Sequence, residues 1–225
     1  AIVAGMYAVW HGPEGIRRIA RRARGYALAL AEGVRHLGHQ VLAEPFFDTV
    51  RVEVTGGHAA EVVEAARIRG MNLRLVDETT VCVTFDETST REDLRRLLVA
   101  FDLDGRGVPK DLDALLGGAD GEFPAGLRRE SAYLTHPIFN RYHSETELLR
   151  YINKLRGRDL SLTHSMIPLG SCTMKLNATT EMIPVTWPEF GRLHPFAPKD
   201  QAAGYARVFE DLERWLAEIT GFKAV

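Results

Sequence analysis

The chain is poor in cysteine. Cys82 and Cys172 are its only two, and they lie far apart without forming a CxxC pair. A disulfide framework is therefore not expected, and a reducing compartment is the default. The histidines fit no standard zinc spacing, and no His-Glu-x-x-His motif accompanies them, so we expect no metal site. The histidines considered as ligands are His136, His143, His164 and His194.

The chain also lacks a strong charge and a long apolar run. Its formal net charge is −2, which calls for neither nucleic acid nor an acidic membrane as a partner. The longest apolar stretch, residues 1–10, is too short to span a bilayer and has no basic segment before it. We interpret it as core sequence. Because the chain starts without methionine and ends at GFKAV, where a strand is about to begin, we expect a piece of a longer protein.

The composition is that of a globular protein. Hydrophobic residues make up 45% of the chain and charged residues 26%, which is enough apolar material for a core. The length fits one large domain or two small ones.

Residues 1–104 show alternating helical and strand periods. Apolar spacings of three and four predict helices at 13–37 and 59–67, and a capping box of Thr90 and Asp93 starts a third. Period-two alternation predicts strands at 49–54, 73–75 and 81–85, the last two forming an antiparallel hairpin. The order predicts a small α+β domain with a three-strand sheet.

The rest of the chain is less regular. Residues 105–130 read as a surface linker with about one helical turn, and residues 131–225 as mainly helical and irregular. Ser144 and Glu147 start one helix, and the last runs from about Lys199 to Thr220, where Gly221 stops it.

Five arginines crowd the first half of the helix at 13–37. They could form an anion-binding face, but few aromatic residues interleave with them, which favours a solvated or subunit-facing surface. They are Arg17, Arg18, Arg21, Arg22 and Arg24.

The segment 167–177, IPLGSCTMKLN, carries the strongest chemical signal. Its Gly-Ser-Cys-Thr run can offer backbone N–H groups and the hydroxyls of Ser171 and Thr173 to a carboxylate or phosphate. Cys172 could be a nucleophile activated by Lys175 or His164, although an inert thiol in a buried turn is the commoner case. Lys175 could form a Schiff base, but surface lysines are far commoner.

Three runs in this chain resemble one known family. They are THPIFNRYHSETELLRYINKLRGRDLSLTHSMIPLGSCTMKLN at 135–177, EMIPVTWPEFGRLHPFAP at 181–198 and MYAVWHGPEGIRRIA at 6–20. They are similar to the P-protein, glycine dehydrogenase (decarboxylating), of the glycine cleavage system. The resemblance covers essentially the whole chain and is weakest in residues 102–130.

The resemblance implies a chain at the junction of two homologous halves, each a fold-type I enzyme of pyridoxal 5'-phosphate (PLP). Residues 1–104 would be the small C-terminal α+β domain of the first half, 105–130 a linker, and 131–225 the start of the second, catalytic half. The PLP lysine of the family lies farther downstream. Lys175 matches the lysine of the GSCTMK motif instead, so the chain alone is expected to be inactive, without covalently bound PLP.

The family decarboxylates glycine and passes the aminomethyl group to the lipoyl arm of H-protein, as a homodimer or a two-subunit assembly. The sequence shows no targeting segment, so we expect a bacterial cytoplasm, or the mitochondrial matrix if the source is a eukaryote. Ser171, Cys172, Thr173 and Lys175 would line the pocket, with Ser171 and Thr173 donating hydrogen bonds near the glycine carboxylate or PLP. Two alternatives are a non-catalytic amino-acid-binding or regulatory α+β module and a thiol enzyme that uses Cys172.

Overall fold

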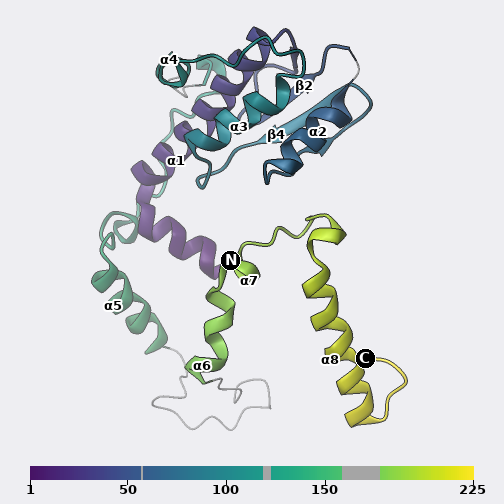
Figure 1. Ribbon diagram of the computed structural model, residues 1–225. Helices are drawn as coiled ribbons and strands as arrows, with labels where there is room; N and C mark the ends of the chain where they lie inside the picture. Colours follow the sequence, from purple (N-terminus) through teal and green to yellow (C-terminus); the bar gives the residue numbers. More distant parts are fainter. Residues whose placement is uncertain (57, 119–122, 159–177) are drawn as a thin grey trace. The chain divides into compact units, whose positions relative to one another are not determined.

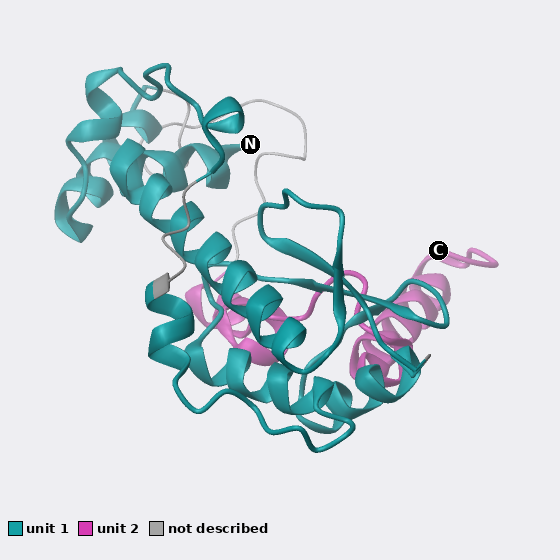
Figure 2. Ribbon diagram, turned by 90° about the horizontal axis from the view of Figure 1, so that it is seen from above, with its two compact units in different colours: residues 1–159 teal, residues 160–225 magenta. Residues whose placement is uncertain are grey.

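The computed structural model describes residues 1–56, 58–118, 123–158 and 178–225. Two compact units make up the chain, residues 1–159 and residues 160–225, and Figure 2 colours them separately. The first unit holds a mixed α+β domain, and the described part of the second is built from helices (Figure 1).

Four short antiparallel strands form the sheet of the first unit, in the order β1-β2-β4-β3. They are Gln40–Leu42 (β1), Thr49–Glu53 (β2), Arg74–Leu75 (β3) and Thr80–Thr84 (β4). The prediction of three strands was wrong by one, because three residues in β1 are too few to establish a period of two. The predicted antiparallel hairpin is confirmed, since Leu75 pairs with Val81.

One face of the sheet is apolar and buried. Val50 pairs with Val83 and Val52 with Val81, and all four side chains are at most 2% exposed. Arg51 and Cys82 pair on the opposite face, where Arg51 is exposed and Cys82 half-buried. Such alternation is typical of a sheet that is covered on one side.

Helices α1 (Ile2–His36), α2 (Ala59–Ile68) and α3 (Arg91–Phe101) cover the buried face (Figure 1). Helix α1 packs on β2 and α3, and α2 packs on β4 and α3. The capping box that starts α3 is confirmed. The N–H of Asp93 donates to Thr90 Oγ1 (3.2 Å), and the N–H of Thr90 donates to Asp93 Oδ2 (2.9 Å).

Helix α1 begins earlier than predicted. Its helical turns start at Ile2, and Gly12 (φ 61°, ψ −179°) is a kink between two helical segments. Residues 1–10 were expected to be core sequence, but in the described chain only Val9 is buried, while Ile2 and Val3 are more than four-fifths exposed.

His39 lies buried at the end of the core. Its Nδ1 accepts a hydrogen bond from the Thr55 N–H (3.3 Å), and its Nε2 lies 2.8 Å from the carbonyl oxygen of Phe101. A carbonyl can only accept, so Nε2 carries the proton and donates it. The imidazole thereby joins the turn after α1 to the end of α3.

The segment after α3 returns to α1. It contains α4 (Leu112–Gly118), which packs on α1, and a short 3-10 turn, η1 (Ala125–Leu127). The predicted helical turn around Leu112 is confirmed, and this side chain is 6% exposed.

Two further helical elements complete the first unit. The turn η2 (Pro137–Asn140) packs on α1, and α5 (Glu145–Arg156) follows it. The predicted start of α5 at Ser144 is confirmed, because the Ser144 hydroxyl accepts the N–H of Glu147 (3.4 Å).

The described residues of the second unit form short helices and one long one. They are α6 (Thr179–Met182), η4 (Ile183–Thr186), α7 (Pro188–Gly191), η5 (Lys199–Gln201) and α8 (Ala203–Thr220). Helix α8 ends at Gly221, as predicted, with φ +77°. No helix in the described ranges is long and apolar enough to cross a membrane.

Candidate functional site

The predicted pocket residues Ser171, Cys172, Thr173 and Lys175 lie outside the described residues, as does His164. The described chain resumes at Ala178. Its N–H donates to Glu181 Oε2 (3.1 Å), which caps the start of α6. The roles assigned to the four pocket residues therefore stay predictions.

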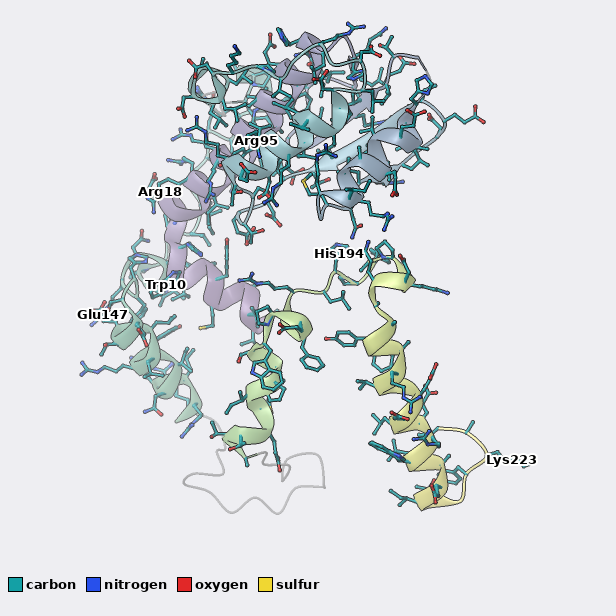
Figure 3. All side chains as sticks on the ribbon, in the orientation of Figure 1. Trp10, Arg18, Arg95, Glu147, His194 and Lys223 are labelled. Carbon is teal, nitrogen blue, oxygen red and sulfur yellow. The ribbon has the colours of Figure 1, made fainter. Side chains whose placement is uncertain are left out.

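A polar cavity of about 350 Å³ lies at the kink of α1. Trp10, His11, Glu14 and Arg18 line it from α1, and His143 lines it from the segment before α5; Trp10 and Arg18 are labelled in Figure 3. Its described lining contains no serine, threonine, cysteine or lysine; the polar groups it offers are two imidazoles, a carboxylate and a guanidinium.

Residues 133–143 are attached to α1 on both sides of the kink. His143 Nδ1 lies 2.7 Å from the carbonyl oxygen of Trp10 and donates to it, and the Tyr133 hydroxyl donates to the carbonyl of Pro13 (2.6 Å). Gly12 interrupts the helix, so the carbonyl of Trp10 belongs to the last turn before the kink, where carbonyls lack intrahelical partners. The cavity at the kink is therefore held by hydrogen bonds between distant parts of the chain.

The histidines predicted not to form a metal site make hydrogen bonds to the backbone where the structure describes them. His136 Nδ1 accepts the N–H of Ile138 (3.3 Å), and His194 Nδ1 accepts the N–H of Phe196 (3.1 Å); His194 is labelled in Figure 3. Among the described residues, no group of three His, Cys, Asp or Glu side chains could hold a metal ion.

Among the α1 arginines, Arg24 departs from the predicted solvated or subunit-facing surface, whereas Arg22 is exposed and bonded to another loop. Arg24 is only 5% exposed; it donates to the carbonyl of Phe46, and its guanidinium lies 4.3 Å from the ring centroid of Phe123. Arg22 donates to the carbonyl of Ser89 (2.7 Å) in the loop after β4. Both side chains thus hold parts of the first unit together, a role that helical periodicity could not reveal.

Cys82 occupies the face of β4 opposite to Val81 and Val83, as predicted. It is a free thiol and half-buried. In register it lies opposite Arg51 on β2 and Arg74 on β3.

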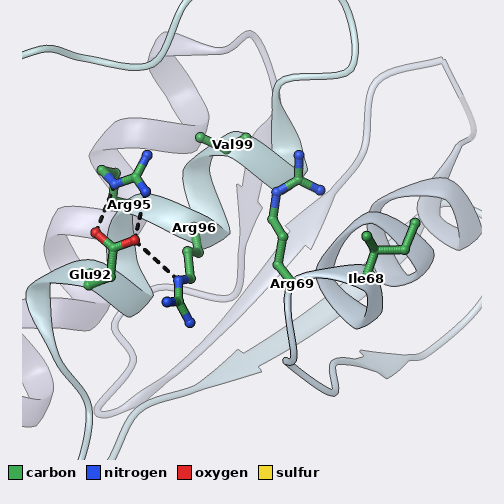
Figure 4. A pocket seen from close by; sticks show the side chains of 6 residues that line it. All are labelled: Ile68, Arg69, Glu92, Arg95, Arg96 and Val99. Atoms are coloured by element: carbon green, nitrogen blue, oxygen red, sulfur yellow. Dashed lines mark hydrogen bonds and ion pairs between the residues drawn. The ribbon is translucent and has the colours of Figure 1, made fainter.

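A second cavity, of about 400 Å³, lies between α2 and α3 and is drawn in Figure 4. The Glu92 carboxylate accepts hydrogen bonds from Arg95 (2.6 and 2.8 Å) and from Arg96 (3.1 Å). The hydrogen bonds from Arg95, aided by those from Arg96 and by both positive charges, lower the pKa of Glu92 to about 2. This carboxylate balances one of the three guanidinium charges in the lining.

The replacement Arg95→Gln should raise the pKa of Glu92 toward its ordinary value of 4.5, because the largest contribution to the shift is the Arg95 hydrogen bond. Since the pKa is depressed, the pair stabilises the fold above about pH 4.5 and loses this effect as the pH falls through about 2. An NMR titration of the Glu92 side chain measures the midpoint. Arg69→Gln is the control, because the Arg69 guanidinium lines the same cavity but makes no hydrogen bond to Glu92. This variant should leave the Glu92 midpoint unchanged. Equal shifts of the midpoint in both variants would contradict the role given to Arg95.

A third cavity, of about 440 Å³, lies between α1 and residues 123–133. It brings Arg17 and Arg21 of the arginine-rich helix beside Arg128 and Arg129, which were not considered as candidates from the sequence. The available signal was the arginine pair followed four residues later by an aromatic ring, Tyr133. Spacing within α1 alone could not show that these residues meet.

Comparisons with known proteins give one consistent result. Residues 1–101 match the family model described as Glycine cleavage system P-protein. The whole chain is 52% identical to part of the Nostoc punctiforme protein named Glycine dehydrogenase (decarboxylating). Over 99% of its length it is 53% identical to the Arabidopsis thaliana protein named Glycine dehydrogenase (decarboxylating) 1, mitochondrial. The chain spans only 23% and 21% of the lengths of these two relatives.

Proposed function

Because this chain belongs to the glycine cleavage system P-protein family, we propose that it acts as one part of a glycine dehydrogenase (decarboxylating). The observation that carries the proposal is the 52% identity that extends over the whole chain, beyond the 101 residues matched by the family model. In the intact enzyme, glycine would lose CO2 and its aminomethyl group would pass to the lipoyl arm of H-protein. PLP would supply the electron sink for the decarboxylation.

The proposed place of the chain is the junction between two PLP-enzyme-like halves. We assign residues 1–104 to the small domain of the first half, residues 105–130 to a linker, and residues 131–225 to the start of the catalytic half. The sheet supports the first assignment, since within the described part of the chain helices pack on one face of its four antiparallel strands, as in a compact α+β layer.

The described residues do not provide a covalent anchor for PLP. That anchor is a lysine in a pocket. No lysine lines any of the three cavities, and the four lysines in the described ranges, Lys110, Lys154, Lys199 and Lys223, are all exposed. Lys175 resembles the lysine of the GSCTMK motif rather than the PLP lysine of the family, so we propose that the anchor is supplied by other parts of the intact enzyme and that this chain alone is inactive.

The contribution of this chain to the active site is proposed to come from 167–177. The hydroxyls of Ser171 and Thr173 would donate hydrogen bonds to the glycine carboxylate, and Cys172 and Lys175 would line the same pocket. Small donors in an apolar segment suit this task, because a carboxylate that leaves water must regain its hydrogen bonds from the protein.

Ser171→Ala, made in the intact enzyme that contains this segment, should lower kcat/KM for glycine about tenfold, because a hydrogen bond to a charged group contributes about 1.5 kcal/mol or more. The assay measures CO2 released from carboxyl-labelled glycine in the presence of PLP and lipoylated H-protein. The matched control is Thr146→Ala, which removes an exposed hydroxyl on α5.

Two outcomes of this assay bear on different claims. Release of CO2 by the unaltered enzyme tests the proposed reaction itself. If that enzyme is active and Ser171→Ala matches Thr146→Ala, Ser171 does not belong to the glycine pocket. An unaltered enzyme that releases no CO2 would leave the amino-acid-binding or regulatory module as the better account of the sheet domain.

A further inference from the structure

We propose that the cavity between α2 and α3, drawn in Figure 4, binds a small soluble molecule that carries a phosphate group. The cavity has a volume of about 400 Å³, within the range of about 300–1,000 Å³ that small-molecule sites occupy. It uses none of the residues that the proposed function places beside glycine. The side chains that line it are Ile68, Arg69, Glu92, Arg95, Arg96 and Val99.

Helix α3 forms one wall of the cavity. Its lining residues are Glu92, Arg95, Arg96 and Val99. Their spacings of three and four place them on one side of the helix. The opposite side of α3 lies in the core, where its leucines and Phe101 fix the helix to the sheet domain. The arginines of this wall are therefore carried by a rigid element.

The C-terminal end of α2 forms the other wall. Helix α2 packs on α3, and Arg69 is its C-cap residue. Arg69 Nη1 donates to the carbonyl of Ala65 in the last turn of α2 (2.7 Å), and the side chain is half-buried. This bond holds the guanidinium at the helix end and leaves Nε and Nη2 as donors for an oxyanion.

Glu92 orients the arginines of α3. Arg95 uses both Nε and Nη2 for this carboxylate (2.8 and 2.6 Å), whereas Arg96 uses Nε alone (3.1 Å). The two terminal amino groups of Arg96 therefore remain as donors, and a guanidinium matches the oxygens of a phosphate group. Because Glu92 positions Arg96 before a ligand arrives, less conformational entropy is lost on binding.

The described lining holds more positive than negative charge. Three guanidinium groups face one carboxylate, that of Glu92, whose pKa of about 2 keeps it ionised at neutral pH. Two positive charges remain in excess. A phosphate monoester carries a charge of about −1.5 to −2 at pH 7, so one phosphate group balances this excess.

The test is an NMR titration of the full 225-residue chain with inorganic phosphate, at mildly alkaline pH and low ionic strength. The methyl signals of Val99 report binding, since this side chain lines the cavity and is present in every variant. We expect a saturable shift of these signals. The dissociation constant should rise at least about tenfold in Arg96→Gln, because a charge-assisted contact is lost.

Arg91→Gln is the matched control for this titration. It removes the same charge from α3, but outside the cavity, where Arg91 pairs with Asp113 (2.6 Å). This variant should bind phosphate as the unaltered chain does. Arg69→Gln repeats the test from the wall of α2, with the same expected weakening, if Arg96→Gln does not fold.

Two further probes identify the class of ligand. Malonate also carries two negative charges but divides them between two carboxylates, and we expect it to bind at least about threefold more weakly than phosphate. Equal or tighter binding of malonate would overturn the assignment to phosphate. Vesicles of phosphatidic acid and phosphatidylcholine should not sediment the chain; sedimentation that Arg96→Gln abolishes would replace the soluble ligand with a lipid headgroup.

The site itself stands or falls with the Val99 signals. Absence of a saturable shift with phosphate would overturn it, and so would equal losses of affinity in Arg96→Gln and Arg91→Gln. Neither result would bear on the proposed release of CO2 from glycine, which is measured in the intact enzyme.

Discussion

Replacing Phe101 with alanine should lower the free energy of unfolding of the first unit by about 4 kcal/mol, as expected for a large aromatic side chain removed from a core. Phe101 ends α3 and is 0% exposed, and it is among the largest fully buried side chains of the chain. Its ring centroid lies 5.8 Å from that of His39, and its carbonyl accepts the His39 proton. Denaturant unfolding followed by circular dichroism measures the loss.

Ile68→Ala is the control for this prediction. It removes a large apolar side chain from α2 of the same unit, but one that is 72% exposed. Its effect should stay within about 0.5 kcal/mol. If Phe101→Ala cost no more than this control, the packing of α3 on the sheet and α1 would be wrong.

The local elements of the first unit could be predicted because local rules determine them. Helix α2 was expected at 59–67 and spans Ala59–Ile68, and the capping box of Thr90 and Asp93 starts α3 at the expected residue. Likewise, Gly221 ends α8 in the left-handed conformation that glycine adopts without strain. In each case the signal lies within about four residues of the feature that it predicts.

Features that depend on distant residues escaped prediction. Strand β1 is identified by its pairing with β2, because its three residues show no clear alternation. The contact of His143 with Trp10 joins residues 133 positions apart. The third cavity likewise depends on residues 123–133 lying beside α1, which no period or motif in either segment indicates.

The resemblance assigned the glycine pocket, whereas the residues alone indicated only that Ser171 and Thr173 could bind a carboxylate or phosphate. From the residues alone, Cys172 was more readily an inert thiol than a nucleophile, and Lys175 a surface lysine. Only the motif around them assigned a pocket role, and this segment lies outside the described residues. The 52% identity along the chain supports the family, and the individual roles stay predictions.

The pair Gly12-Pro13 shows how a correct local signal can still give a wrong boundary. Proline suits the first turn of a helix, and a helical segment does begin at Pro13. The chain before Gly12 is also helical, so the glycine marks a kink rather than a start. With φ 61° and ψ −179°, Gly12 adopts a conformation that is essentially restricted to glycine.

Gly12→Ala should therefore destabilise the first unit by about 3 kcal/mol, because it adds backbone strain to a steric clash. A Cβ at this position would lie 2.6 Å from the carbonyl oxygen of Phe139 and 3.0 Å from Cε1 of His143. Relief of the clash requires η2 to move away from α1, which would break the bond between His143 and the Trp10 carbonyl. Thermal unfolding measures the stability, and the NMR signal of the His143 Nδ1 proton reports the bond.

Gly5→Ala provides the comparison on the same helical segment. No atom lies within 4 Å of a Cβ at Gly5, and alanine favours a helix over glycine by about 1 kcal/mol. This variant should be neutral or slightly more stable, with the His143 signal unchanged. Equal stability and an equal His143 signal in Gly12→Ala and Gly5→Ala would contradict the prediction. The kink at Gly12 would then not be required to attach residues 133–143 to α1.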